Sequence, residues 1–353
     1  MNELRRGVYI LLFLVLFIGG LYYARGFLIP LTLASVLALL FTGISNFLEK
    51  RKVGRAVSSL VSVLLFVLVV ALIITALSVQ LNSFMDNMGE MKEKVIDMLR
   101  TAAHWLQEKL GISYDDQKEI LKEKSRSSEL PSSLMSMAVD AILVIVYMFL
   151  ILFYRTHIKR FILKIVPKKA KRNAINIVHE SVLVIQKYLG GLGAMVVMLW
   201  IMYSIGFSIV GVDNALFFAI LCGTLEIIPF VGNLAGSSIT ALAVLVQGGG
   251  SSMLIGVLAT YLTIQFIQTY ILEPLVVGEQ VSINPLFTIV GIVLGEMLWG
   301  AAGMFLAIPL LGIAKIICDH VPDLKPYGFL IGSRTKKKKK FPEKIKSAFS
   351  KGK

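Results

Sequence analysis

Eight apolar runs, most of them long enough to cross a lipid bilayer as a helix, dominate this sequence. They cover residues 8–24, 28–48, 56–79, 137–154, 192–212, 214–247, 253–272 and 285–317. A spanning helix needs about 20 mainly apolar residues, and these runs lack the apolar–polar alternation of barrel strands. Charged residues make up 16% of the chain, against roughly 25% in soluble domains. We therefore predict an all-α polytopic membrane protein and exclude a soluble enzyme.

Residues that carry enzyme chemistry are sparse. The two cysteines, Cys222 and Cys318, lie inside apolar runs, and the four histidines are not clustered. The sequence therefore predicts no metal site, no thiol nucleophile and no cofactor. It also lacks the Ser–His or paired-aspartate patterns of an intramembrane hydrolase, so we expect a protein that is not an enzyme.

The distribution of Lys and Arg predicts the orientation of the chain. Residues 155–187 hold nine Lys/Arg and one Glu, whereas residues 80–135 hold eight Lys/Arg and ten Asp/Glu. The first segment is expected inside the cell and the second outside, with both termini cytoplasmic in a bacterial inner membrane. The resulting divisions are spans in 1–79, an exterior insert 80–135, a span 136–154, a cytoplasmic amphipathic linker 155–190, a transport core 191–320 and a basic tail 321–353.

The net charge of +14 is concentrated at the C-terminal end, where residues 331–353 hold ten Lys/Arg and one Glu. Such a run is typical of a solvated tail. Base-stacking aromatic residues do not alternate with it, which argues against nucleic acid as a partner. We expect the tail to contact anionic lipid headgroups.

The exterior insert carries an apolar stripe with heptad spacing that includes Met91, Val95 and Met98. One interpretation is a helix that lies on its own domain or on the membrane surface. The other is a helix that associates with a second copy and forms a homo-oligomer.

The most informative feature is a pair of long, broken segments, residues 214–247 and 284–317. At a shift of 70 residues they match at four positions, among them Glu226 with Glu296. Each glutamate lies just before an interruption rich in Pro or Gly. Broken apolar segments at corresponding places in two halves are a sequence indicator of a transport site.

Two topologies fit these segments. Each segment could be a re-entrant hairpin, so that one opens outward and the other inward, or each could cross once as a kinked helix. Both termini are inside in either case. The hairpin arrangement is favoured here.

The breaks supply the candidate binding and gating residues. A charged group at the bilayer centre is costly and therefore usually functional or paired, and helix breaks free backbone groups to coordinate a solute. We expect Glu226 and Glu296 to share a cation or a proton. Gln265 and Gln268, three residues apart, can face the same cavity. The binding candidates are Glu226, Glu296, Asn233, Gln265 and Gln268, and the helix-break or gating candidates are Pro229, Gly232, Pro274, Gly300, Gly303 and Pro309.

From about residue 5 to 320 the chain resembles the AI-2E family of autoinducer-2 exporters. The motifs that carry this resemblance are EIIPFVG at 226–232, EPLVVG at 273–278, NPL at 284–286 and GAAGMFLAIPL at 300–310. The family's break maps onto Pro229, Val231 and Gly232, and its later prolines map onto Pro274 and Pro309. Family members often have a basic residue where this chain has Leu275.

The resemblance implies a multi-pass transporter that exports a small polar solute by alternating access. It also extends to sodium (lithium)/proton antiporters, for which the intramembrane glutamates would be the coupling site. A third alternative, from a different class, is a non-transporting membrane scaffold built on the exterior helix and the lysine tail.

Overall fold

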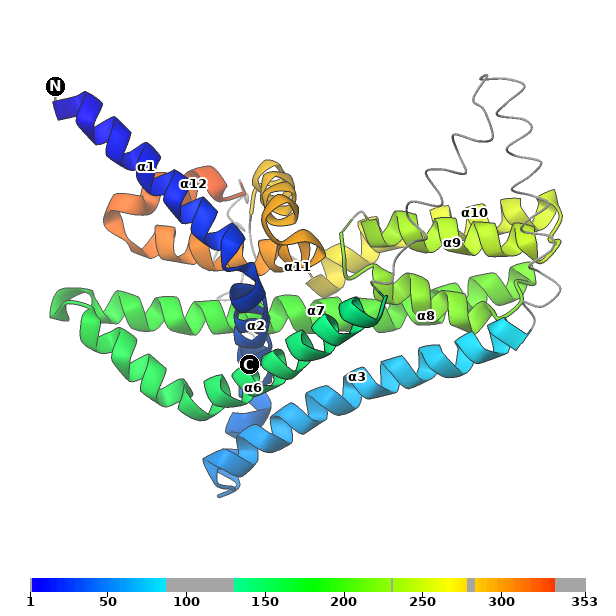
Figure 1. The fold of residues 1–353 in the computed structure, drawn as a ribbon, viewed down its shortest axis with the longest axis horizontal. Coiled ribbons are helices and arrows are strands. Elements are labelled where there is room, and N and C mark those ends of the chain that lie inside the picture. The colour runs from blue at the N-terminus through cyan, green and yellow to red at the C-terminus, as the bar shows by residue number, and fades with distance from the viewer. Residues whose placement is uncertain (1, 87–129, 230, 278–282, 334–353) are drawn as a thin grey trace, which may run out of the picture.

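The structure, a computed structural model, describes residues 2–86, 130–229, 231–277 and 283–333. The N-terminal half holds α1 (Asn2–Tyr23), α2 (Arg25–Lys50), α3 (Arg55–Asp86), α6 (Leu130–Ile165), the 3₁₀ turn η1 (Lys168–Ala170) and α7 (Lys171–Val210). The C-terminal half holds α8 (Ala215–Leu225), α9 (Val231–Val246), α10 (Ser251–Ile267), the π-helix η2 (Gln268–Val277), α11 (Pro285–His320), η3 (Pro322–Leu324) and α12 (Lys325–Ile331) (Figure 1). Within the described ranges there is no strand, and a single bridge joins Ile283 to Gly332.

The helices confirm the predicted fold class. Seven of the described helical stretches are long and apolar enough to cross a membrane. The remaining predicted run, residues 214–247, forms the two shorter apolar helices α8 and α9 instead. The heptad stripe at Met91, Val95 and Met98 and most of the basic tail lie outside the described residues.

The predicted linker 155–190 is divided in the structure. Its first part is the end of α6, and its second part is joined to the predicted span 192–212 in α7. After α6 ends at Ile165, just before Pro167, α7 runs without a break for 40 residues. Proline lacks an N–H group and restricts the residue before it, which explains the stop. Gly211 ends α7 in the left-handed conformation, with φ of 84°, which is a common helix terminus.

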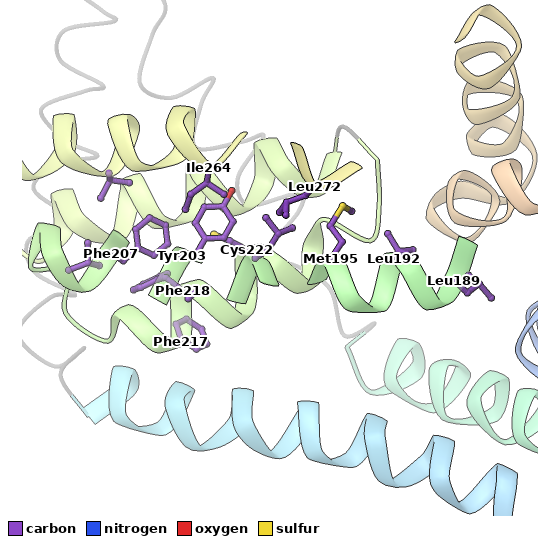
Figure 2. Close-up of a cluster of buried hydrophobic side chains, with 14 of the residues drawn as sticks. Leu189, Leu192, Met195, Tyr203, Phe207, Phe217, Phe218, Cys222, Ile264 and Leu272 are labelled. Carbon is purple, nitrogen blue, oxygen red and sulfur yellow. The ribbon is translucent and has the colours of Figure 1, made fainter. Parts of the chain in front are cut away.

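Helix α7 forms the centre of the molecule and contacts α2, α8, α10 and α11. Its buried face includes Tyr203 and Phe207, which lie between Phe218 of α8 and Ile264 of α10 (Figure 2). Burial of aromatic and aliphatic side chains along one helix holds the surrounding helices in place.

A second cluster joins α2, α3 and α6. Small residues such as Ala34 and Ala38 on α2 allow close approach of the buried Met148 and Leu152 of α6. Close packing of this kind is the main force between helices in lipid. Helices α2, α3 and α6 thus share a cluster of their own, and α2 also contacts α7.

Candidate functional site

The first broken segment is a tight helical hairpin. α8 ends at Leu225, the turn contains Pro229, and α9 begins at Val231. A methyl group placed on Gly232 would lie 1.6 Å from the carbonyl oxygen of Leu225, so only glycine fits there. Further from the turn, the Cys222 Sγ of α8 lies 3.4 Å from the Thr240 Oγ1 of α9.

The second broken segment is also a hairpin, although its two arms are contiguous in α11. Gly300 has φ of 60° and ψ of −143°, a conformation outside the helical region, and it separates the arms. Gly295 of the first arm contacts Gly303 of the second arm close to this break. Further from the break, Gly291 faces Leu311. At the open end, the Asn284 N–H donates to the Ile331 carbonyl at 2.8 Å.

The turn of the first hairpin contacts the arms of the second. Ile228, in the turn of the first hairpin, packs against Ile292, Met304 and Ala307 of the second. Four of the predicted helix-break residues lie at or next to the observed breaks: Pro229, Gly232, Gly300 and Gly303. Pro309 instead lies buried within the second arm of α11, which continues through it, and Pro274 lies within η2.

A buried polar cluster lies beside the turn of the first hairpin. The Gln268 side-chain amide donates to Glu226 Oε2 at 3.4 Å, and both side chains are buried, with 3% and 8% exposed. Close by in sequence, the Asn233 amide donates to the Gln265 side-chain oxygen. Four of the five predicted binding residues are thus joined in two pairs between the hairpin and α10–η2.

Three oxygen atoms of this cluster have no hydrogen-bond partner in the structure: Glu226 Oε1, Gln268 Oε1 and Asn233 Oδ1. Leaving such atoms buried and unpaired costs about 1–3 kcal/mol each. An unpaired carboxylate oxygen inside an apolar bundle is therefore an indication of a ligand. The cluster offers acceptors to a cation or to the hydroxyl groups of a solute.

The geometry of the cluster depends on the change from α10 to η2. Gln268 is the first residue of the π-helix, and Gln265 belongs to the preceding α-helix. π-helical turns are rare and often occur at functional sites. Two residues of the same elements that sequence analysis missed are Tyr261 of α10, whose hydroxyl interacts with Asn233, and Glu273 of η2. Tyr261 is one helical turn before Gln265, so the helical repeat could have indicated it.

Glu296 lies elsewhere. It is exposed on the first arm of α11, four residues before Gly300. Although the structure describes both side chains, it shows no hydrogen bond between Glu296 and Glu226. The shared role of the two glutamates stays a prediction. Within the described ranges, no group of three or more His, Cys, Asp or Glu is placed to hold a metal ion.

The two hairpins and the polar cluster lie within the part of the chain that one protein-family model matches. The sequence model of the AI-2E family transporters matches residues 11–323. The chain belongs to the AI-2E family. The seven described helices that are long and apolar enough to cross a membrane agree with this family of transporters.

Individual relatives are distant from this AI-2E protein. YueF of Bacillus subtilis is 24% identical over 85% of this chain and 84% of its own length, and YhhT of Escherichia coli K12 is 22% identical over 93% and 95%. YrrI of Bacillus subtilis is 26% identical, but the match covers 38% of this chain and only 37% of YrrI. All three are named as candidate transport proteins.

Proposed function

We propose that this protein is an inner-membrane exporter of a small polar solute of the autoinducer-2 type and has no enzymatic activity. The solute would bind at the cluster of Glu226, Gln268, Asn233 and Gln265. Membership of the AI-2E family supports transport as the activity. In this proposal both termini are cytoplasmic, as the distribution of Lys and Arg indicates.

The observation that carries the proposal is the buried Glu226–Gln268 pair with its unpaired oxygens. A charged acidic side chain at the centre of the bilayer costs about 3 kcal/mol, so such residues are rare unless they have a function. A purely structural role would be expected to satisfy both carboxylate oxygens, as buried polar networks usually are. A solute that donates hydrogen bonds would satisfy the free oxygen atoms.

The cluster lies between two different elements of the chain. Glu226 and Asn233 belong to the first hairpin, whereas Gln265 and Gln268 belong to α10 and η2. The hairpin is internally rigid because glycine allows its helices to meet closely at Gly232 and Gly236. A rigid hairpin that shifts against η2 would open and close the cluster, as alternating access requires.

A second candidate function is sodium (lithium)/proton antiport. The specific observation in its favour is that the unpaired atoms of the cluster are all oxygens, the ligand type that hard cations prefer. In that case Glu226 would exchange a proton for the cation. The non-transporting scaffold has less support, because it leaves the buried carboxylate unexplained.

Reconstitution in proteoliposomes tests these functions directly. Vesicles loaded with autoinducer-2, or with sodium under an imposed pH gradient, are compared with protein-free vesicles. Protein-dependent release of the solute supports export, and protein-dependent sodium flux coupled to pH supports antiport. Absence of both fluxes in correctly folded protein would contradict the proposal and favour the scaffold.

A further inference from the structure

Helix α1 is attached to the rest of the molecule near its C-terminal end. The Trp299 indole N–H donates to the Leu21 carbonyl at 3.0 Å, which joins α1 to the first arm of α11. From Arg5 to Ile18, every side chain of α1 is exposed. Towards its N-terminal end, α1 runs beside the short helix α12 (Figure 1).

A groove of about 1030 Å³ lies between these two helices. One wall is α1, with Tyr9 and Phe13 among its lining residues, and the other is formed by Leu324 and Tyr327. Arg5 and Arg6 line the same groove at the N-terminal end of α1. The groove is therefore apolar along most of its length and positively charged at one end.

We propose that this groove is a binding site for an anionic phospholipid. The phosphate of the headgroup would lie against Arg5 and Arg6, and the acyl chains would lie along Tyr9, Phe13 and Leu14. Arginine binds phosphate well because its guanidinium group offers several N–H donors in one plane. Basic pockets between helices at the membrane surface are a known form of recognition of anionic lipids.

The length of the groove agrees with a lipid occupant. From Arg5 to Leu14 the helix rises about 14 Å, at 1.5 Å per residue. One leaflet of the hydrocarbon core is about 15 Å thick, half of the full 30 Å. A lipid whose phosphate contacts the arginines would therefore place its chains along the apolar walls. Tyr9, one helical turn after Arg5, lies near the charged end, where interfacial aromatic residues are common.

The charges around the groove are consistent with an anionic headgroup. None of the residues that line the groove is acidic. On the neighbouring helix, Asp319 is paired with Lys315 at 2.5 Å. Asp323 lies one residue before the lining Leu324, and Lys325 lies one residue after it, so their charges offset each other. Arg5 and Arg6 are thus the charged side chains that line the groove.

The experiment compares two charge-matched variants of the full-length protein, purified in mild detergent. R5Q/R6Q removes both arginines from the groove. K168Q/K169Q removes two exposed lysines of η1 that do not line it. Because both variants keep the basic tail, its effect on lipid binding is the same in each. Native mass spectrometry measures the binding of phosphatidylglycerol and of zwitterionic phosphatidylcholine, and gel filtration checks folding.

The wild type and K168Q/K169Q are expected to retain phosphatidylglycerol in preference to phosphatidylcholine. R5Q/R6Q should bind phosphatidylglycerol about thirtyfold more weakly, since each arginine contributes about a fivefold effect. A third variant, I10W, keeps the charges but fills the groove, and it should weaken both lipids. Equal binding of phosphatidylglycerol by R5Q/R6Q and K168Q/K169Q would overturn the proposal. If R5Q/R6Q or I10W had a lower oligomer mass than the wild type but the same lipid binding, the proposal would also be overturned. That result would show that a second copy of the protein occupies the groove.

Discussion

Gly303 packs so closely on Gly295 that a methyl group on Gly303 would lie 1.9 Å from the Gly295 carbonyl oxygen. The same relation exists between Gly232 and Leu225 in the first hairpin, at 1.6 Å. Close backbone contact of this kind is typical of glycine between membrane helices. Within each hairpin, the two arms are therefore held together by a backbone contact close to the turn.

Substitution G303A should force the arms of α11 apart. Overpacking typically costs about 1–3 kcal/mol, so the thermal unfolding midpoint in detergent should fall. The control is G190A, at a helical glycine with no other heavy atom within 4 Å of the added methyl group. That change should be neutral or slightly stabilising. Equal midpoints for the two variants would contradict the hairpin geometry of α11.

A second prediction concerns the packing unit of α2 and α6. Arg155 of α6 donates to Ser45 Oγ at 2.6 Å and to Asn46 Oδ1 at 2.7 Å, and it lies 3.0 Å from Glu49 Oε2. Its side chain is only 16% exposed. R155A should therefore lower the free energy of unfolding by about 2–3 kcal/mol, because bonds to charged groups are strong and Ser45 is buried.

The exposed Arg160 on the same helix provides the control for this prediction. R160A should change the unfolding free energy by less than about 0.5 kcal/mol. Chemical denaturation of both variants in detergent measures the difference. A similar loss in R155A and R160A would show that the contacts of Arg155 with α2 add no stability.

The orientation of the chain is open to labelling. Single cysteines at Gln107 and Lys169, in a background with C222A and C318S, would be tested with a membrane-impermeant maleimide on intact cells. The cysteine at position 107 should react in intact cells, and the cysteine at position 169 should react only after the membrane is permeabilised. Labelling of Lys169 in intact cells would contradict the orientation derived from Lys and Arg.

Self-association through the exterior insert is a separate prediction. Replacement of Met91, Val95 and Met98 by Ser should weaken a heptad interface and lower the oligomer mass in detergent. Replacement of Lys92, Glu93 and Lys94 by Ser, on the other faces of the same stretch, is the control. If the first variant keeps the wild-type mass, the stripe faces its own domain or the membrane surface.

Much of the fold could be predicted because lipid restricts the chain to helices of a certain length. The apolar runs, the break at Pro229 and the three-residue spacing of Gln265 and Gln268 are local features, and local features are legible in a sequence. The continuity of α7 was harder to predict, because the amphipathic pattern before residue 190 and the apolar run 192–212 look like two elements, whereas one helix covers both.

The candidate site depends on tertiary contacts that no local pattern specifies. Sequence symmetry suggested a shared role for Glu226 and Glu296, which stays a prediction. The contact of Glu226 with Gln268 depends instead on the start of a π-helix. The groove behind the lipid proposal joins Arg5 to Tyr327, which are far apart in the chain. Such a relation becomes visible only when the helices are packed.

The transport rate of E226Q in proteoliposomes tests the central claim most directly. Glutamine keeps the shape of the side chain and removes a costly charge, so E226Q should express and fold like the wild type. Its rate should fall about tenfold or more, equivalent to ~1.4 kcal/mol or more. The matched control E180Q alters an exposed glutamate of α7 outside the cluster and should transport normally, while E296Q shows whether the second glutamate contributes. If E226Q transports at the wild-type rate, the polar cluster is not the transport site.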